Sequence, residues 1–288
     1  MKRTLKLFRI MAGILLGLVS PQAMDSKYVE REQQAHSGFI AKQNHTIIKT
    51  IGKYEERQSP YSTFKVPLAL MGFDAGILKT KDSPKWTFKE EYEKKFQGWY
   101  THEKGIKYGW CQDHTPATFM KHSVVWFSHQ ITEFLKSEKF QGYISKFNYG
   151  NQDVSGTPGM NDGLLNSWLG TSLEISPREQ VEFLERFLAH DLGVSRDAYE
   201  KTREIMERAE EWDGWKLYGK TGGGSGNNGW FIGWIEKGEQ RIIFAQYLDL
   251  DDPNLDLEGI PLHSAVGLRA KDLIKREILK FFQESAGK

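Results

Sequence analysis

The distribution of strand-like and helix-like segments along the 288 residues constrains the fold more than any other feature of the sequence. Apolar and β-branched runs around a short turn predict a hairpin over residues 38–51. Three further strands are predicted near the other end, at 215–221, 230–235 and 241–248. The residues between follow mostly helical spacing. We therefore expect an α/β fold in which both chain ends build one sheet, flanked by helices, with a mostly helical insertion.

Apolar residues spaced three and four apart predict the helices. The helix that begins at Ser176 has the strongest start signal, because Pro177 and Glu179 complete a capping box. Residues 80–115 and 145–170 are predicted to be irregular. The other predicted helices are one that starts near Pro60 and those at 115–136, 195–210 and 264–282.

Residues 1–23 have the pattern of a secretory signal peptide. A basic segment, 1–9, precedes an apolar run of about ten residues at 10–19, which is too short to span a bilayer. Ala23 ends a small-residue exit. We expect residues 24–288 to form a catalytic domain that is exported to the periplasm. After cleavage of the signal peptide we expect no stable association with the membrane. An uncleaved N-terminal anchor is the alternative.

Charge and cysteine content narrow the classes of partner. The net charge of +1 predicts neither a nucleic-acid nor a membrane-surface partner. Neither H-E-x-x-H nor C-x-x-C occurs, so no metal site is predicted. Cys111 is the single cysteine, which excludes an intrachain disulfide. Nothing in the sequence predicts the oligomeric state.

Ser62 and Lys65 are the candidate nucleophile and base. They stand three residues apart at a predicted helix start, so their side chains would be neighbours on one face. A serine hydroxyl becomes a good nucleophile when a base removes its proton. A lysine can be that base if burial lowers its pKa from about 10.4 toward neutrality. An ordinary capped helix is the alternative, because a short S-x-x-K pattern is common.

Two glycine-containing segments imitate nucleotide-binding motifs. Residues 214–221 fit G-x-x-x-x-G-K-T, and residues 224–229 fit G-x-G-x-x-G. Both motifs require a loop that leads into a helix, where backbone amides face phosphates. Here the first segment has strand-forming residues and the second leads into a predicted strand. We therefore predict no nucleotide site.

Three further motifs follow Ser62 and Lys65 in chain order. They are Ser123-Val124-Val125, Tyr149-Gly150-Asn151 and Lys220-Thr221-Gly222. If Lys220-Thr221-Gly222 lies on an edge strand of the sheet, it would present an ammonium and a hydroxyl to an anionic substrate. The set is much more specific than any one member.

These motifs resemble those of the class D (OXA-type) serine β-lactamases. The resemblance covers most of residues 38–280, and its middle element is Ser-Val-Val where class A enzymes have S-D-N. It implies a β-lactamase/transpeptidase-like fold with an antiparallel sheet made from both chain ends. The longer matching segments are 60–65, 115–126, 147–151, 167–169, 175–177, 229–234 and 267–269.

The resemblance implies hydrolysis of β-lactams, a small-molecule substrate, through an acyl-enzyme. Ser62 would attack the ring. Lys65, carbamylated by CO2 from bicarbonate, would be the general base in acylation and deacylation, and no other cofactor is implied. Ser123 and Lys220 would deliver a proton to the leaving nitrogen.

The resemblance also implies supporting roles. Thr221 and Arg269 would hold the substrate carboxylate, and the amide of Gly223 would complete an oxyanion hole with that of the nucleophile. Val124 would keep the pocket apolar, and Trp168 would hydrogen-bond the carbamate. The alternative for Arg269 is a surface charge on a helix, and the alternative for Trp168 is a core residue without a catalytic role. Tyr149-Gly150-Asn151 is interpreted as shaping a loop.

Other activities remain as alternatives. Residues 162–166, Asp-Gly-Leu-Leu-Asn, resemble the E-x-x-L-N loop of class A enzymes, and we interpret this similarity as accidental. A penicillin-binding D-Ala-D-Ala peptidase would be acylated but slow to release the adduct. A β-lactam sensor domain would stay acylated, and such sensors have several spanning helices upstream. The glycines at 222–224 leave the choice among penicillins, cephalosporins and carbapenems open.

Overall fold

The computed structural model describes residues 36–95, 102–224, 227–263 and 265–286. The predicted signal peptide at 1–23 lies outside the described residues. Within the described ranges, no helix is both long enough and apolar enough to cross a membrane. In chain order the elements are β1 (Gly38–Gln43), β2 (Thr46–Gly52), η1 (Tyr61–Phe64), α2 (Lys65–Asp74), η2 (Glu90–Lys95), α3 (His102–Lys107), α4 (Pro116–His122), α5 (Val125–Phe147), α6 (Gly163–Asn166), α7 (Pro177–Leu188), α8 (Arg196–Met206), β3 (Glu207–Trp212), β4 (Trp215–Gly223), β5 (Asn228–Lys237), β6 (Gln240–Asp249) and α9 (Val266–Ala286).

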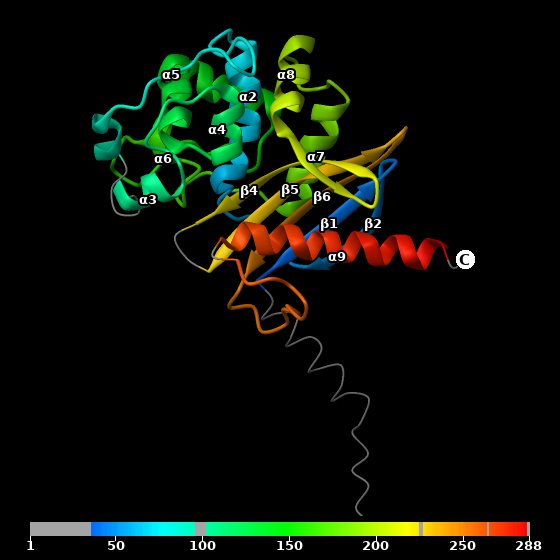
Figure 1. The fold of residues 1–288 in the computed structure, drawn as a ribbon. Coiled ribbons are helices and arrows are strands. Elements are labelled where there is room, and N and C mark those ends of the chain that lie inside the picture. The colour runs from blue at the N-terminus through cyan, green and yellow to red at the C-terminus, as the bar shows by residue number, and fades with distance from the viewer. Residues whose placement is uncertain (1–35, 96–101, 225–226, 264, 287–288) are drawn as a thin grey trace, which may run out of the picture.

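One antiparallel sheet joins the two ends of the chain, as predicted. Its strand order is β2-β1-β6-β5-β4-β3, so β1 from the start pairs with β6 from the end. The β1–β2 hairpin turns at Asn44 and His45, whose φ values of 49° and 65° suit a tight two-residue turn. Figure 1 shows the N-terminal strands in blue beside the yellow and orange C-terminal strands.

The two faces of the sheet are covered by different helices. The long helix α9 packs on one face, against β4, β5 and β6. On the other face α7 packs against β1, β5 and β6, α8 contacts β4, and the other helices lie on this same side of the sheet (Figure 1). Strand β5 alternates between the two sides, since Trp230, Ile232 and Trp234 belong to the helical-side core while Phe231 and Ile235 belong to the α9-side core.

Two helix predictions need correction. The segment at 115–136 is not one helix, because Ser123 adopts the left-handed conformation (φ 59°, ψ 40°) and ends α4 before α5 begins. Helix α5 then has a non-helical residue at Lys136 and resumes to Phe147. The charged segment at 195–210 is helical only to Met206. Its remainder forms β3, a sixth strand, because pairing with β4 outweighs the local helical pattern.

The Tyr149-Gly150-Asn151 motif fastens the segment that follows α5, and its loop-shaping role is confirmed. Tyr149 is fully buried, and its hydroxyl donates to Gln180 Oε1 at 3.4 Å. Gly150 has φ 54°, a conformation that favours glycine. Asn151 donates to the Ser172 carbonyl at 2.7 Å and accepts from the Glu174 amide at 3.1 Å. This motif therefore holds the loop that carries Trp168.

Candidate active site

Ser62 lies in the turn η1, just before α2. Thr63 Oγ1 closes this turn by donating to the Pro60 carbonyl at 2.7 Å. Gln180 of α7 donates to the same Thr63 hydroxyl at 3.0 Å. The turn is therefore anchored from both sides while Ser62 itself is only partly buried. Its hydroxyl stays within reach of a small molecule.

Lys65 is the first residue of α2 and is fully buried. Its Nζ lies 3.1 Å from Ser62 Oγ, as the three-residue spacing predicted. No salt bridge involving Lys65 is found among the described residues, and its Nζ lies over the ring of Phe119, 6.0 Å from the centroid. Burial without a counter-ion disfavours the charged amine and lowers the pKa of Lys65 to about 7. A large share of this lysine is therefore neutral near pH 7 and able to accept a proton.

Ser123 and Lys220 meet although 97 positions separate them. Lys220 Nζ donates to Ser123 Oγ at 2.9 Å and to the Thr221 carbonyl at 2.7 Å. The left-handed turn at Ser123 directs the chain from α4 into α5 at this contact, and Val124 beside it is fully buried. Burial, with Lys65 and Arg208 nearby, lowers the pKa of Lys220 well below its ordinary value. The two residues form a second hydroxyl–amine pair.

Arg208 is a site residue that the sequence did not predict. It lies on β3, and its Nε donates to the Gly219 carbonyl of β4 at 2.8 Å. Strand β3 pairs with β4 only as far as Tyr218, so residues 219–223 of β4 are not paired with β3. Lys220 therefore lies on an unpaired edge of the sheet, as the sequence predicted. Burial lowers the pKa of Arg208, although Glu210 opposes this. Its position was missed because its segment was predicted to be helical.

Trp168 is fully buried, and its ring stacks on Phe64 with centroids 5.1 Å apart. Its carbonyl accepts from Ser59 Oγ at 3.0 Å, which ties its loop to the chain just before η1. The indole Nε1 is buried and has no hydrogen-bond partner among the described residues. A buried donor left unpaired is costly and usually marks a missing partner.

The predicted substrate-binding residues lie at the start of α9 and the end of β4. A Cβ placed on Gly267 would lie 3.1 Å from Thr221 Cβ and 2.6 Å from the Gly222 carbonyl, so α9 starts directly against this strand. Arg269, two residues later, is partly buried and donates to the His263 carbonyl at 3.1 Å. Gly223 is exposed. The structure brings these segments together, and their binding of a substrate stays a prediction.

The rejected motifs are accounted for by the structure. Residues 215–223 form β4 and 228–237 form β5, so neither glycine pattern leads into a helix. Asp162 binds within its own loop, accepting from Thr157 N at 2.7 Å and from Asn166 Nδ2 at 2.9 Å. The described part of the chain contains no cluster of three or more metal-binding side chains.

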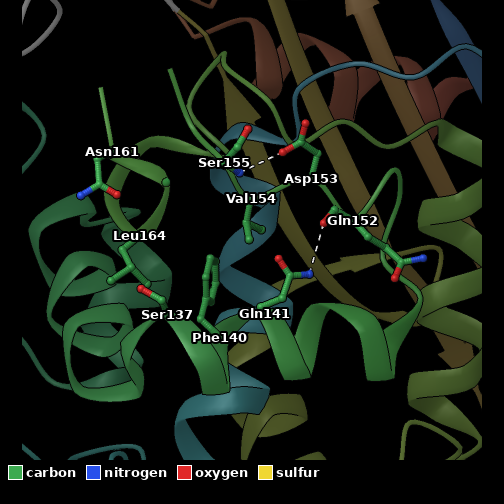
Figure 2. Close-up of a pocket in the computed structure, with 10 residues that line it drawn as sticks. Ser137, Phe140, Gln141, Gln152, Asp153, Val154, Ser155, Asn161 and Leu164 are labelled. Atoms are coloured by element: carbon green, nitrogen blue, oxygen red, sulfur yellow. Dashed lines mark hydrogen bonds between the residues drawn. The ribbon is translucent and has the colours of Figure 1, made fainter. Parts of the chain in front are cut away.

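A separate cavity of about 470 Å3 lies between α5 and the segment at 152–164. Figure 2 shows its lining, in which Phe140, Val154 and Leu164 supply apolar surface and Gln141 and Asn161 supply amides. None of the predicted site residues lines it. Phe140 connects it to the site, because its ring also contacts the ring of Trp168 edge-on with centroids 6.2 Å apart.

Comparison with known proteins gives concordant matches. The model of the penicillin binding protein transpeptidase domain matches residues 22–268. The chain is 41% identical to β-lactamase OXA-9 of Klebsiella pneumoniae over 225 residues, which is 74% of this chain and 78% of that protein. It is 40% identical to β-lactamase OXA-1 of Escherichia coli over 202 residues, 68% of each chain. The solved structure of the OXA-427 class D β-lactamase matches with a TM-score of 0.73 and 32% identity, over 86% of this chain and 99% of that one.

The buried Lys65 yields a prediction about stability. Between pH 7 and 10.5 the unfolded lysine binds more protons than the folded one, so the free energy of unfolding should rise with pH over this window. Lys65→Met should remove this cost, on the order of 4 kcal/mol at pH 7, and stabilise the protein most at low pH. Urea unfolding of both proteins in degassed buffer, at several pH values, measures the difference. Parallel curves for the two proteins would contradict a lowered lysine pKa.

Proposed function

The chain belongs to the class D β-lactamases, within the penicillin-binding transpeptidase-domain family, and from this premise we propose that it hydrolyses β-lactams through an ester on Ser62. One observation carries the proposal. Ser62 Oγ lies 3.1 Å from the amine of a fully buried lysine whose pKa is about 7. Such a pair supplies an accessible hydroxyl and a base that is partly unprotonated at neutral pH.

Acylation begins at Ser62. The side chain of Lys65 takes the proton of the hydroxyl as Oγ forms a bond to the lactam carbonyl carbon. The carbonyl oxygen gains negative charge, which the backbone amides of Ser62 and Gly223 would stabilise, and losing one such donor typically costs about 100- to 1000-fold in rate. The carbon–nitrogen bond of the ring then breaks as the carbonyl re-forms.

The leaving nitrogen needs a proton when that bond breaks. Ser123 Oγ is well suited to donate it, because Lys220 Nζ lies 2.9 Å away and restores the proton to the hydroxyl. The lowered pKa of Lys220 makes its ammonium a better acid than an exposed lysine. Thr221 and Arg269 would bind the carboxylate of the substrate through a hydroxyl and a guanidinium.

The residues around Lys65 fit a CO2-derived carbamate on its Nζ. Only an unprotonated amine reacts with CO2, and burial supplies that form here. The unpartnered Nε1 of Trp168 is the donor that would hold the group, and the apolar Val124 would help to exclude water. A carbamate supplies an anionic oxygen base that can also activate the water that hydrolyses the ester. No metal is proposed to take part.

Efficient release of the acyl group distinguishes this proposal from a penicillin-binding peptidase or a sensor domain. Both alternatives would form the same ester on Ser62 and keep it. Residues 1–23 are proposed to be a signal peptide and 24–288 the catalytic domain, with export to the periplasm. An N-terminus near Met24 in the exported protein would test this division.

The proposed function predicts steady turnover. The purified domain should hydrolyse a chromogenic β-lactam steadily, and added bicarbonate should raise the rate. Ser62→Ala and Lys65→Ala should each lower kcat by on the order of 10⁴-fold or more, because nucleophile and base act as a unit. Ser145→Ala and Lys79→Ala, both at exposed positions, are matched controls that should retain the rate. A single stoichiometric burst without a steady rate, whatever the bicarbonate concentration, would favour the peptidase or sensor.

A separate prediction concerns Trp168. Trp168→Phe keeps a ring to stack on Phe64 but removes the Nε1 donor, so deacylation should slow and require more bicarbonate. Trp234→Phe is the matched control, because Trp234 is also fully buried with an unpartnered Nε1 but lies on β5. Mass spectrometry of the acyl-enzyme over time gives the deacylation rate. If both variants depend on bicarbonate like the wild type, Trp168 does not hold the carbamate.

A further inference from the structure

Tyr61, the residue just before Ser62, has an unusual backbone conformation. Its φ is 46°, a region in which bulky residues are rarely found. Such a conformation persists when the surrounding structure holds the residue in place. Tyr61 is half-buried, and it packs against the core on the helical side of the sheet. An aromatic ring is therefore fixed next to Ser62.

The ring of Tyr61 lies against two glycines from different walls of the site. A Cβ placed on Gly224 would lie 2.6 Å from Tyr61 Cζ and 2.7 Å from Tyr61 Oη, closer than real atoms approach. A Cβ placed on Gly170, two residues after Trp168, would lie 3.5 Å from Tyr61 Cε1. Tyr61 thus contacts both the end of the Lys220 strand and the loop of Trp168. The absence of a side chain at Gly224 is what makes room for the ring.

The neighbouring Gly223 has a different environment. A Cβ placed there would meet nothing within 4 Å, and the residue is exposed. The space beside Gly223 is therefore open, whereas the space beside Gly224 is filled by the tyrosine ring. These two glycines are not equivalent, although the sequence Gly222-Gly223-Gly224 gives no sign of it.

Tyr61 lies close to the position that the substrate carbonyl would occupy. Tyr61 directly precedes Ser62, and Gly224 directly follows Gly223, so the ring touches the chain next to both proposed oxyanion donors. In penicillins and cephalosporins the acylamino side chain is attached to the carbon beside the lactam carbonyl. That side chain must therefore extend into space close to the carbonyl binding position, where Tyr61 restricts the available room.

We propose that Tyr61 is a specificity-determining residue that limits the size of the acylamino side chain which the site accepts. This inference rests on the proposed function of the same site. Flat and slender acyl groups pass the ring, and broad or branched groups collide with it. The hydroxyl does not add charge at neutral pH, because burial raises the pKa of Tyr61, although the side chain of Asn228 partly opposes this. The restriction is therefore steric.

The test measures acylation of Ser62 by mass spectrometry, which needs no turnover. The compounds are 6-aminopenicillanic acid, which lacks an acyl group, benzylpenicillin, which has one flat ring, and a penicillin with a 2,6-dimethoxyphenyl acyl group. Tyr61→Ala should raise the acylation rate constant for the broad compound, relative to 6-aminopenicillanic acid, by about 10-fold or more. Tyr61→Phe should keep the wild-type ratio.

Gly224 supplies an independent check. Gly224→Ala should slow acylation by all three compounds because its methyl group displaces the ring, and adding Tyr61→Ala should restore it. Equal effects of Tyr61→Ala on the three compounds would overturn the proposal and leave a positioning role. Absence of both an adduct and any hydrolysis of these compounds by the wild-type protein would instead overturn the proposed function, and this inference with it.

Discussion

The structure depends on one unfavourable feature, the burial of the Lys65 amine, which lies beside the Ser62 hydroxyl. An ammonium in an apolar interior without a counter-ion is costly, and the cost appears here as a pKa of about 7. Apolar neighbours maintain it, because every residue of α2 from Lys65 to Phe73 is buried. The chemical reactivity of the site and its cost in stability therefore have the same origin.

The fold brings three distant segments to this contact. The start of α2 supplies the first hydroxyl–amine pair, and the α4–α5 junction with β4 supplies the second. Pairing of β1 with β6 fixes the sheet, and α9 starts against the end of β4. Hydrogen bonds of Ser59 and Gln180 then connect the nucleophile turn to the Trp168 loop and to α7. The position of each reactive side chain is thus set by elements that are far apart in sequence.

The sequence predicted what depends on local spacing. Patterns within a few residues predicted that Ser62 and Lys65 are neighbours and that a capping box begins at Ser176. Such patterns also predicted strands at both chain ends, which form one sheet. It failed where tertiary contacts decide. Strand β3 forms because β4 is available to pair with it, and the break at Ser123 depends on a left-handed residue that helical spacing does not reveal. Arg208 and Tyr61 were missed for the same reason, since their roles arise from contacts with Gly219 and Gly224.

A carbamate on Lys65 is most directly detected by carbon-13 NMR of the protein equilibrated with carbon-13-labelled bicarbonate at about pH 8, above the pKa of Lys65. We expect one carbamate resonance that is present in the wild-type protein and in Lys79→Ala, is absent in Lys65→Met, and fades as the pH falls below about 7. A spectrum without this resonance, or a resonance that persists in Lys65→Met, would contradict the claim that the buried Lys65 is the modified base.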